Sequence, residues 1–457
     1  MKRGFHQAMF WLALTALAAG CGGGGGSSSA PPAPVAALPL TGNLDPAFGG
    51  AGEFRLRSPP SDFRVLIALQ TDEAGNIYVA GTSTGGDFAI LKLDPAGQPD
   101  PTFGADGRVY VDVDNGSTDS VTGMVIEPGG KLYVAGTTRH GTGTARFAVV
   151  KLEANGSLAS DFGVMGRAFI AETGHSLFSN ALLRDAQGNL YVTGTKVPST
   201  GRPAFAVAKL TAAGAPVASF GVGGLRTIAF EKERLDFYAG PAVRDSQGNL
   251  YIAAIGYPDA FSGFTPFQKV ITIAKLDADG HLVASYAAGG QLEMPPSCGG
   301  VAALAVGRND DLYVATNPTC GKYATIDSIV KLDRDGRLVT SFGNAGTAQN
   351  VLGQVSGEAG DAVSALAVAA DGSIFAAGNA VDPGACPVLK VAKLDENGRL
   401  VPAFGVNGVF RNQYRGYKDR VQAMVLDRQG RLYVGANSEG ACDASPASSE
   451  FIVVRLK

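Results

Sequence analysis

The stretch GNIYVAG at residues 75–81 decides the fold, because related stretches recur along the whole chain. The next two copies are GKLYVAG at 130–136 and GNLYV at 188–192. Four further copies centre on Tyr251, Tyr313, Phe375 and Tyr433. Neighbouring copies lie 55 to 62 residues apart. Self-similarity at a nearly fixed period is the signature of a repeat architecture.

Two other markers follow the same period. A Lys-Leu pair recurs at Lys92, Lys151, Lys209, Lys275, Lys331 and Lys393, with Arg455-Leu456 as its last copy. A Phe-Gly pair recurs at Phe48, Phe103, Phe162, Phe220, Phe342 and Phe404, with a degenerate copy at Tyr286-Ala287. Three independent markers therefore agree on seven repeats of about sixty residues.

Each repeat is predicted to form four strands. In the second repeat we expect strands near 121–127, 132–137 and 147–152, and a fourth at 107–113 after Phe103-Gly104. The first two strands are joined by tight turns rich in Gly, Asn and Asp, which are typical of hairpins. Strands such as VLIAL at 65–69 are apolar on both faces, so both faces should be buried. Four-stranded sheets packed around an axis satisfy this requirement, which predicts a β-propeller.

The two ends of the chain predict how the ring closes. The last repeat stops after a third strand at 451–456. The first repeat is preceded by an orphan LDPAFG at 44–49 and a strand near 52–56. We therefore expect an all-β, seven-bladed β-propeller of four-stranded antiparallel blades over residues 41–457. Its last blade would be closed by the N-terminal strand, which removes free sheet edges.

These repeats resemble a known family. The combination of G-N-x-Y-V-A-G with K-L-D and F-G-x-x-G is similar to the delta-60 repeat β-propellers of bacterial envelope proteins, and more distantly to NHL-type propellers. The resemblance covers roughly residues 41–457 and implies the fold. It carries no catalytic residues that could be transferred to this chain.

The N-terminus predicts a cellular address. Lys2 and Arg3 precede an apolar run that ends in AAGC at 18–21, and this end resembles a bacterial lipobox. The resemblance implies a signal peptide over 1–20, cleavage before Cys21 and lipid on Cys21. Residues 22–40 are rich in Gly, Ser and Pro and would form a tether reaching about 25 Å. Gly22 favours sorting to the outer membrane, facing either the periplasm or the outside. The alternative is a plain secretory signal.

Composition excludes several classes of protein. The chain has 457 residues, 45% hydrophobic residues and a formal net charge of −3. It is too apolar to be disordered, and it lacks the basic block expected of a nucleic-acid binder. The chain has only 4 His, and none is spaced to pair with another, so it offers few side chains for zinc hydrolysis or Ser-His-Asp catalysis.

Four cysteines follow Cys21, and export makes disulfides possible. We call upper the face that carries the connections from fourth to first and from second to third strands. All four cysteines fall in such connections, and adjacency favours Cys298–Cys320 and Cys386–Cys442 among the three possible pairings. Free buried thiols are the alternative, and a thiolate metal site is disfavoured because no Cys-x-x-Cys is present.

The upper-face connections are also the longer and more variable ones. Aromatic and Arg side chains in such loops suit a binding surface on a rigid scaffold. The candidates are Tyr257, Phe261, Phe264, Tyr414, Arg415, Tyr417, Arg139 and His140. The alternative is that these aromatic side chains pack within their own loops.

Three aspartates stand at an equivalent repeat position, eleven residues before the Gly of the aromatic strand. They are Asp119, Asp361 and Asp419. At the start of the innermost strands they would ring the upper mouth of the channel, where converging carboxylates could hold calcium. Recurrence at one repeat position equally fits a structural role, and we expect no obligatory cofactor.

The sequence thus predicts a lipid-anchored, monomeric envelope propeller. We expect it to act as a binding or scaffolding module for a protein or glycan through its upper-face loops. The alternative is a hydrolase or lyase with an active site at the channel mouth, whose activity could depend on a metal. A third reading is a purely structural envelope component.

Overall fold

The computed structural model describes residues 40–57, 63–228, 235–258, 269–294, 299–317, 327–353, 362–381, 387–412, 417–441 and 449–457. The chain divides into two units, Met1–Ala36 and Ala37–Lys457, and every strand lies in the second. The described part contains a single 3-10 turn, Arg308–Asp310, and otherwise only strands and connections. No helix in these ranges has the length and apolar character needed to cross a membrane.

The strands of the second unit form seven four-stranded antiparallel sheets, which we number as blades 1 to 7. The innermost strands are β2 (Phe63–Thr71), β6 (Thr118–Ile126), β10 (His175–Arg184), β14 (Leu235–Arg244), β18 (Val301–Val306), β22 (Ala362–Val368) and β26 (Tyr417–Leu426). The second strands are β3 (Ile77–Ser83), β7 (Leu132–Arg139), β11 (Leu190–Pro198), β15 (Leu250–Pro258), β19 (Leu312–Thr316), β23 (Ile374–Val381) and β27 (Leu432–Ala441).

The third strands are β4 (Phe88–Leu93), β8 (Arg146–Leu152), β12 (Ala204–Leu210), β16 (Val270–Leu276), β20 (Ser328–Leu332), β24 (Pro387–Leu394) and β28 (Ser449–Leu456). The outermost strands are β5 (Arg108–Val111), β9 (Arg167–Ile170), β13 (Leu225–Ile228), β17 (Gln291–Glu293), β21 (Thr347–Gln349), β25 (Val409–Arg411) and, for blade 7, β1 (Glu53–Arg57).

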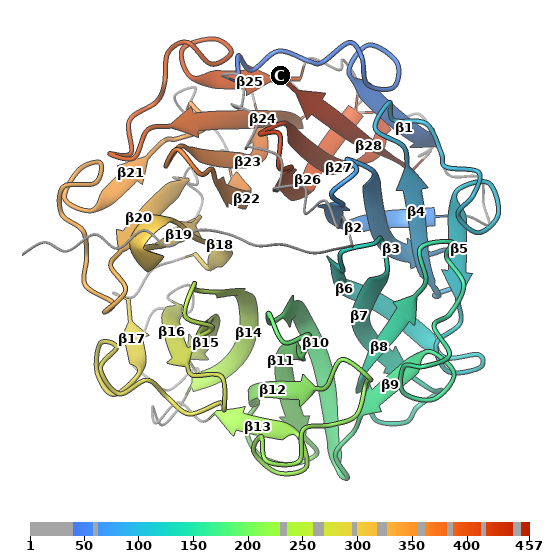
Figure 1. Ribbon diagram of the computed structural model, residues 1–457. Helices are drawn as coiled ribbons and strands as arrows, with labels where there is room; N and C mark the ends of the chain where they lie inside the picture. The colour runs from blue at the N-terminus through green and yellow to red at the C-terminus, as the bar shows by residue number, and fades with distance from the viewer. Residues whose placement is uncertain are drawn as a thin grey trace, which may run out of the picture. The chain divides into compact units, whose positions relative to one another are not determined.

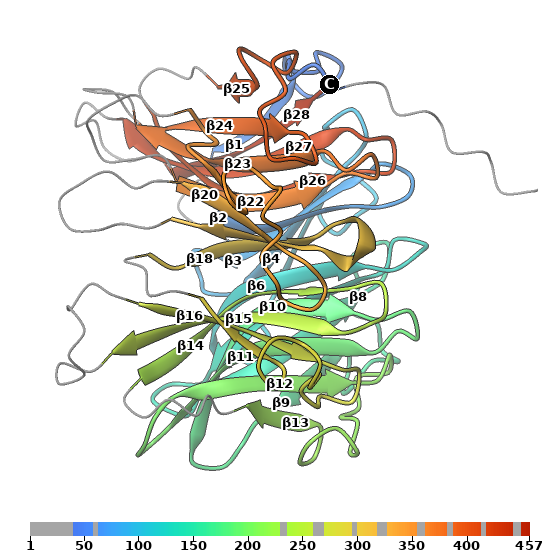
Figure 2. The ribbon, with the colours of Figure 1, turned by 90° about the vertical axis from the view of Figure 1, so that its left-hand side faces the viewer.

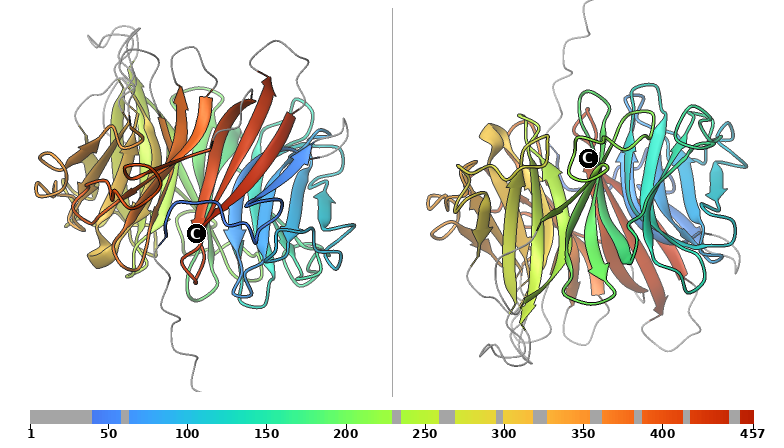
Figure 3. Two further views of the ribbon diagram at one scale, coloured as in Figure 1. Left: turned by 90° about the horizontal axis from the view of Figure 1, so that it is seen from above. Right: turned by 90° about the horizontal axis from the view of Figure 1, so that it is seen from below.

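The blades close into a ring around a central axis, as Figure 1 shows. Each innermost strand contacts the innermost strand of the next blade, and β26 of blade 7 contacts β2 of blade 1. Closure rests on the pairing of β1 with β28, in which Phe54 lies opposite Val453. In Figure 3 the blue strand β1 accordingly runs beside the dark red strand β28. The predicted fold class, including closure by the N-terminal strand, is confirmed.

One detail of the sequence prediction was wrong. The strand near 107–113 was expected to belong to the second repeat, but β5 pairs with β4 and completes blade 1. The outermost strand of blade 2 is instead β9, which follows the third strand in the chain. A fourth strand that follows the third needs only a short connection, and the missing strand of blade 7 comes from the other end of the chain.

The hydrophobic core is divided among the seams between blades. Seven clusters of buried side chains lie in the described residues, and each joins two neighbouring blades. Apolar side chains on both faces of a strand are needed for this arrangement, which explains the apolar strands of the sequence. The ring is therefore stabilised seam by seam rather than by one central core.

The three repeat markers meet in one structural unit inside each blade. In blade 4, the rings of Tyr251 and Tyr286 pack edge to face with centroids 5.5 Å apart. Lys275 Nζ lies 4.7 Å from the centroid of the Tyr251 ring and 3.2 Å from Asp245 Oδ2. The same aromatic pair recurs in all seven blades. The Lys of Lys-Leu is therefore a structural residue.

The degenerate Phe-Gly copy keeps its turn. The Gly of this pair has a left-handed backbone, with φ +55° at Gly49, where a Cβ would meet Glu53 O. Ala287 takes the same left-handed conformation with φ 46°. Strand β17 still forms after it, so the loss of Gly changes the strain in the turn and not the architecture.

Candidate functional site

The seven innermost strands start at the upper face and surround the upper mouth of the channel. In six blades, one residue of the innermost strand lies opposite the fourth residue after the repeated Tyr or Phe of the second strand. We call these residues the mouth ring: Val65, Ser120, Phe178, Tyr238, Ala362 and Arg420. Ser120, Phe178, Tyr238 and Arg420 are exposed. Because side chains alternate along a strand, the neighbours Leu177 and Ser179 are buried.

Two aromatic side chains dominate the mouth ring. Phe178 of blade 3 is 40% exposed and Tyr238 of blade 4 is 43% exposed. They occupy equivalent positions on β10 and β14, which contact each other. Arg420 takes the equivalent position on β26, across the channel (Figure 1). The mouth thus combines an aromatic side with a cationic residue, all carried by strands rather than loops.

Hydrogen bonds across the seams hold this ring in place. Asn437 Oδ1 accepts from Leu66 N at 2.8 Å, and its Nδ2 donates to Leu66 O at 3.0 Å. Asn317 makes the same two bonds to Val363. Threonines make one such bond at other seams, as Thr195 Oγ1 does with Ala239 N at 2.9 Å. These side chains fix the spacing of the innermost strands.

The position that makes these seam bonds is occupied by Ile255 in blade 4. Its partner across β14 and β15 is Tyr238, one of the two exposed aromatics. A Cβ on Gly300 of the next blade would lie 2.8 Å from Ile255 Cδ1. At this position Ile255 therefore makes an apolar contact where other blades have a side-chain hydrogen bond.

A cavity opens beside the mouth ring between blades 5, 6 and 7. Its volume is about 590 Å³. Its polar lining comes from Asn317, Ser364, Asn379, Asp419, Arg420 and Gln422. Asn379 Oδ1 accepts from Val421 N at 3.0 Å, and its amide also donates to Asp419 O. The cavity has the size and the hydrogen-bonding groups needed for a small polar ligand.

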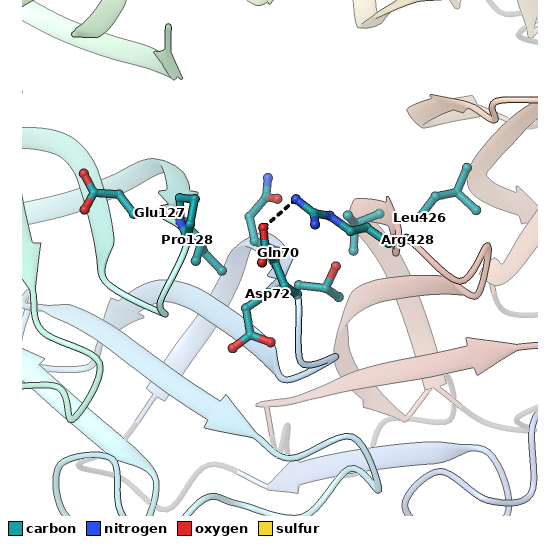
Figure 4. Close-up of a pocket in the computed structure, with 10 residues that line it drawn as sticks. Gln70, Asp72, Glu127, Pro128, Leu426 and Arg428 are labelled. Carbon is teal, nitrogen blue, oxygen red and sulfur yellow. Dashed lines mark ion pairs between the residues drawn. The ribbon is translucent and has the colours of Figure 1, made fainter. Parts of the chain in front are cut away.

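A separate, smaller cavity of about 200 Å³ lies on the lower face of the propeller. It lies where β2, β6 and β26 end, and Figure 4 shows its lining. An ion pair of 2.6 Å between Arg428 Nη2 and Glu73 Oε1 crosses it. Both side chains are exposed, so the pair contributes little to stability.

The structure places Asp119 among other carboxylates on blades 1 and 2. One oxygen each of Asp87, Asp112 and Asp119 lies within 4.8 Å of the others. Burial, followed by the charges of Asp112 and Asp119, raises the pKa of Asp87. Calcium prefers oxygen ligands and takes six to eight of them, so the three carboxylates would supply part of such a set. Asp119 is buried, and its carboxylate accepts from Val113 N at 2.9 Å and Ser117 Oγ at 2.5 Å, which caps the connection before β6.

Asp419 is buried at the start of β26 on blade 7, apart from the carboxylates of blades 1 and 2. Ser438 Oγ donates to its Oδ1 at 2.8 Å. Burial raises its pKa to about 6, against the opposing effects of the Ser438 hydrogen bond and the Arg55 charge. Asp361 lies outside the described residues. Asp119 and Asp419 therefore sit in seams of different blades, and the structure does not bring them together.

The predicted binding residues are distributed as follows. Arg139 ends β7, and both it and His140 are exposed on the upper face. Tyr257 lies in β15 opposite Asp236, and Tyr417 begins β26 opposite Ala441. The remaining candidates lie outside the described residues: Phe261, Phe264, Tyr414, Arg415, Cys21, Cys298, Cys320, Cys386 and Cys442.

Sequence reasoning missed Phe178 and Tyr238. Both stand where the second repeat has Ser120, a position that the strand register shows to be exposed. Aligning the repeats position by position would have shown an aromatic at this position in two successive repeats, but its exposure follows only from the structure. The search for long loops passed over them because they lie inside strands.

The fold defines the protein as a seven-bladed β-propeller, and comparisons with known proteins agree. The chain matches the model of a family described as a domain of unknown function (DUF5122) beta-propeller over residues 75–103 and 128–162. Those two segments coincide with the repeat markers of blades 1 and 2. No curated protein matches the sequence.

Solved structures show similarity in fold. A polysaccharide lyase, the PL25 ulvan lyase, is 11% identical with a TM-score of 0.51, covering 87% of this chain and 95% of its own. The PQQ-bound aldose sugar dehydrogenase of Streptomyces coelicolor is 11% identical with a TM-score of 0.38, covering 89% of this chain and 98% of its own. At such identity the likeness concerns the fold alone.

Proposed function

We propose that this chain is an envelope β-propeller that binds a glycan at the upper mouth of its channel. The observation that carries the proposal is the pair Phe178 and Tyr238, both about two-fifths exposed at equivalent positions of neighbouring blades. Aromatic rings offer a flat apolar face, on which the C–H face of a sugar ring stacks. Rigid strands pre-organise the two rings, which lowers the entropy lost on binding.

Polar groups on the opposite side of the mouth from the aromatic pair suit the hydroxyl groups of such a ligand. Arg420, Ser364 and Gln422 line the cavity beside the mouth ring. A few polar groups converging on a concave site fix the orientation of a ligand. The predicted loop residues Arg139 and His140 are exposed on the same face. The loops that carry the other predicted binding residues would extend this surface; these residues are Tyr257, Phe261, Phe264, Tyr414, Arg415 and Tyr417. A protein partner would dock on the same surface.

The proposal includes the cellular address. Lipid on Cys21 would hold the protein at the outer membrane, with residues 22–40 as a tether and the propeller from residue 41 in the periplasm or outside. Cys298–Cys320 and Cys386–Cys442 would then form in an oxidising compartment. The repeats would be of the delta-60 type, and the protein a monomer.

A rival function is favoured by the carboxylates. Asp87 and Asp419 both have a raised pKa, which is a property of catalytic groups as well as of structural ones. In this alternative the chain is a hydrolase or lyase at the channel mouth, with calcium on Asp87, Asp112 and Asp119. Stoichiometric calcium in the purified protein, lost on Asp112→Asn, would favour the rival.

The proposal is tested by comparing glycan binding of three proteins on an array of bacterial and plant glycans. The first is the unchanged chain, the second carries Phe178→Ala and Tyr238→Ala, and the third carries Tyr110→Ala. Tyr110 is a matched control because it is 41% exposed on the outermost strand β5, away from the mouth. Binding lost in the second protein and retained in the third is the expected result. Equal binding by all three proteins would refute the site.

A further inference from the structure

Seven equivalent turns stand at the lower outer rim of the propeller, each just before an outermost strand. Their central residues are Gly50-Ala51, Ala105-Asp106, Val164-Met165, Val222-Gly223, Ala288-Gly289, Asn344-Ala345 and Val406-Asn407. Asp106 is the one charged residue among them. Val222 is 88% exposed, and Val164, Met165 and Val406 are nearly as exposed. The rim thus carries apolar side chains that point into solvent on blades 2, 3 and 6.

The geometry of the turn does not require these side chains. The second central residue has a left-handed backbone, with φ 52° at Asp106, 54° at Asn407 and 51° at Met165. Asp, Asn and Gly adopt this conformation readily, whereas a long side chain such as Met adopts it at a cost. A residue that breaks a local rule without a gain in packing indicates another role. Met165 is such a residue, and its neighbour Val164 is equally exposed.

The chain enters the propeller at the same edge. Thr41 N donates to Lys457 O at 2.8 Å, at the lower end of β28. Thr41 O accepts from Gly405 N at 2.8 Å, directly beside the turn with Val406. In Figure 2 the C-terminus lies on the side of the connections that lead into the outermost strands. Only residues 22–40 separate this point from Cys21.

We infer that the lower rim rests on the bilayer surface, with Val164, Met165, Val222 and Val406 inserted between lipid headgroups. This inference rests on the lipid anchor of the proposed function. Apolar side chains gain by leaving water at the bilayer interface, and an anchor attached at the same edge keeps them close to it. The upper mouth then faces away from the membrane, toward the ligand.

The charge of the chain decides which lipid surface fits. After residue 20 the chain carries 36 basic and 41 acidic residues. The acidic excess disfavours anionic headgroups, whose surface potential attracts basic segments and repels acidic ones. The partner of the rim is therefore a zwitterionic surface, and its contact is made by apolar side chains.

Tryptophan fluorescence tests the inference on the full lipidated chain. The one Trp of the sequence is Trp11, which cleavage before Cys21 would remove. Val222→Trp and His140→Trp then each carry a single Trp, the first at the lower rim and the second exposed on the upper face as a matched control. Each is reconstituted in vesicles of phosphatidylcholine and phosphatidylethanolamine, with and without brominated acyl chains.

The expected result is a blue-shifted emission that brominated lipid quenches at least twofold for Val222→Trp, with neither effect for His140→Trp. Adding phosphatidylglycerol should weaken the quenching. Equal, water-like emission from both variants on vesicles that retain the protein overturns the inference and leaves the anchor intact. If a second copy of the protein or a partner protein covers the rim and the quenching is lost, the surface is assigned to protein contact. That result also overturns the inference. A mature chain without acyl groups on Cys21 overturns both the anchor and the inference.

Discussion

Asn437 of blade 7 clamps the backbone of Leu66 in blade 1 from both sides, accepting from its N–H at 2.8 Å and donating to its carbonyl at 3.0 Å. These two residues stand 371 positions apart in the chain. Together with the pairing of β1 and β28, they join the last blade to the first. The closed ring, and with it the shape of both channel mouths, depends on this seam.

Replacing Asn437 by Ala should lower the free energy of unfolding by about 1–3 kcal/mol, because it leaves the buried N–H and carbonyl of Leu66 without partners. Asn437→Thr should cost less, since Thr195 makes one such bond at its own seam. Urea unfolding followed by circular dichroism measures both. Asn180→Ala, at an exposed position of β10, is the control and should change stability by less than about 0.5 kcal/mol. Equal effects of Asn437→Ala and Asn180→Ala would show that the clamp contributes nothing.

Replacing Lys275 by Ala should lower the free energy of unfolding by about 3–5 kcal/mol. The ammonium lies between Asp245 Oδ2 at 3.2 Å and Arg334 O at 3.1 Å, and its removal leaves the buried Asp245 carboxylate without its cation. Lys131→Ala is the control, because Lys131 pairs with Glu153 at a more exposed position and should contribute little to stability. Thermal and urea unfolding of both variants make the comparison. A stable Lys275→Ala protein that has lost ligand binding would give this lysine a functional role instead.

Asp419 should make stability depend on pH. Its pKa is raised to about 6 in the folded protein, so the folded state holds the proton more tightly than the unfolded state does. Stability therefore falls as the pH rises from about 4 to about 6, by roughly 2–3 kcal/mol. Asp419→Asn should abolish this decline and be more stable at pH 7.5. Urea unfolding at a series of pH values measures it, and a parallel pH profile for the variant and the parent would contradict the assignment.

Asp119→Ala should lower the free energy of unfolding by about 1–3 kcal/mol, because Val113 N and Ser117 Oγ lose their buried acceptor. The structural interpretation predicts the same loss with calcium and with a chelator present. Melting temperatures in both conditions provide the measurement. A stabilisation by calcium that disappears in Asp119→Ala would instead establish a metal site on Asp87, Asp112 and Asp119.

The sequence predicted the architecture because the repeat is redundant. Tyr251, Lys275 and Tyr286 belong to one structural unit, and the other blades contain its equivalents, so that any one copy confirms the others. The expected strand at 107–113 was placed in the wrong blade because a strand between two repeats has no marker of its own. Only the register of β5 with β4 assigns it to blade 1.

The site was harder to predict, for a physical reason. Exposure of Phe178 and Tyr238 depends on which face of a strand each occupies, and the bulges in β10 and β14 shift that register. The burial of Asp119 and Asp419 depends on contacts within their blade and with the adjacent blade. Neither the exposure of the aromatic pair nor the burial of the aspartates can be predicted from the local sequence pattern. Variable loops were visible in the sequence, whereas the exposed positions of regular strands required the structure.

The central claim is that the aromatic pair at the upper mouth binds the ligand. Calorimetric titration of the glycan selected on the array, against the parent chain, Tyr238→Phe and Tyr238→Ala, tests it most directly. The account predicts a dissociation constant within about threefold of the parent for Tyr238→Phe, which keeps the ring, and at least about tenfold weaker for Tyr238→Ala, equivalent to about 1.4 kcal/mol. Equal affinity for all three proteins would contradict it.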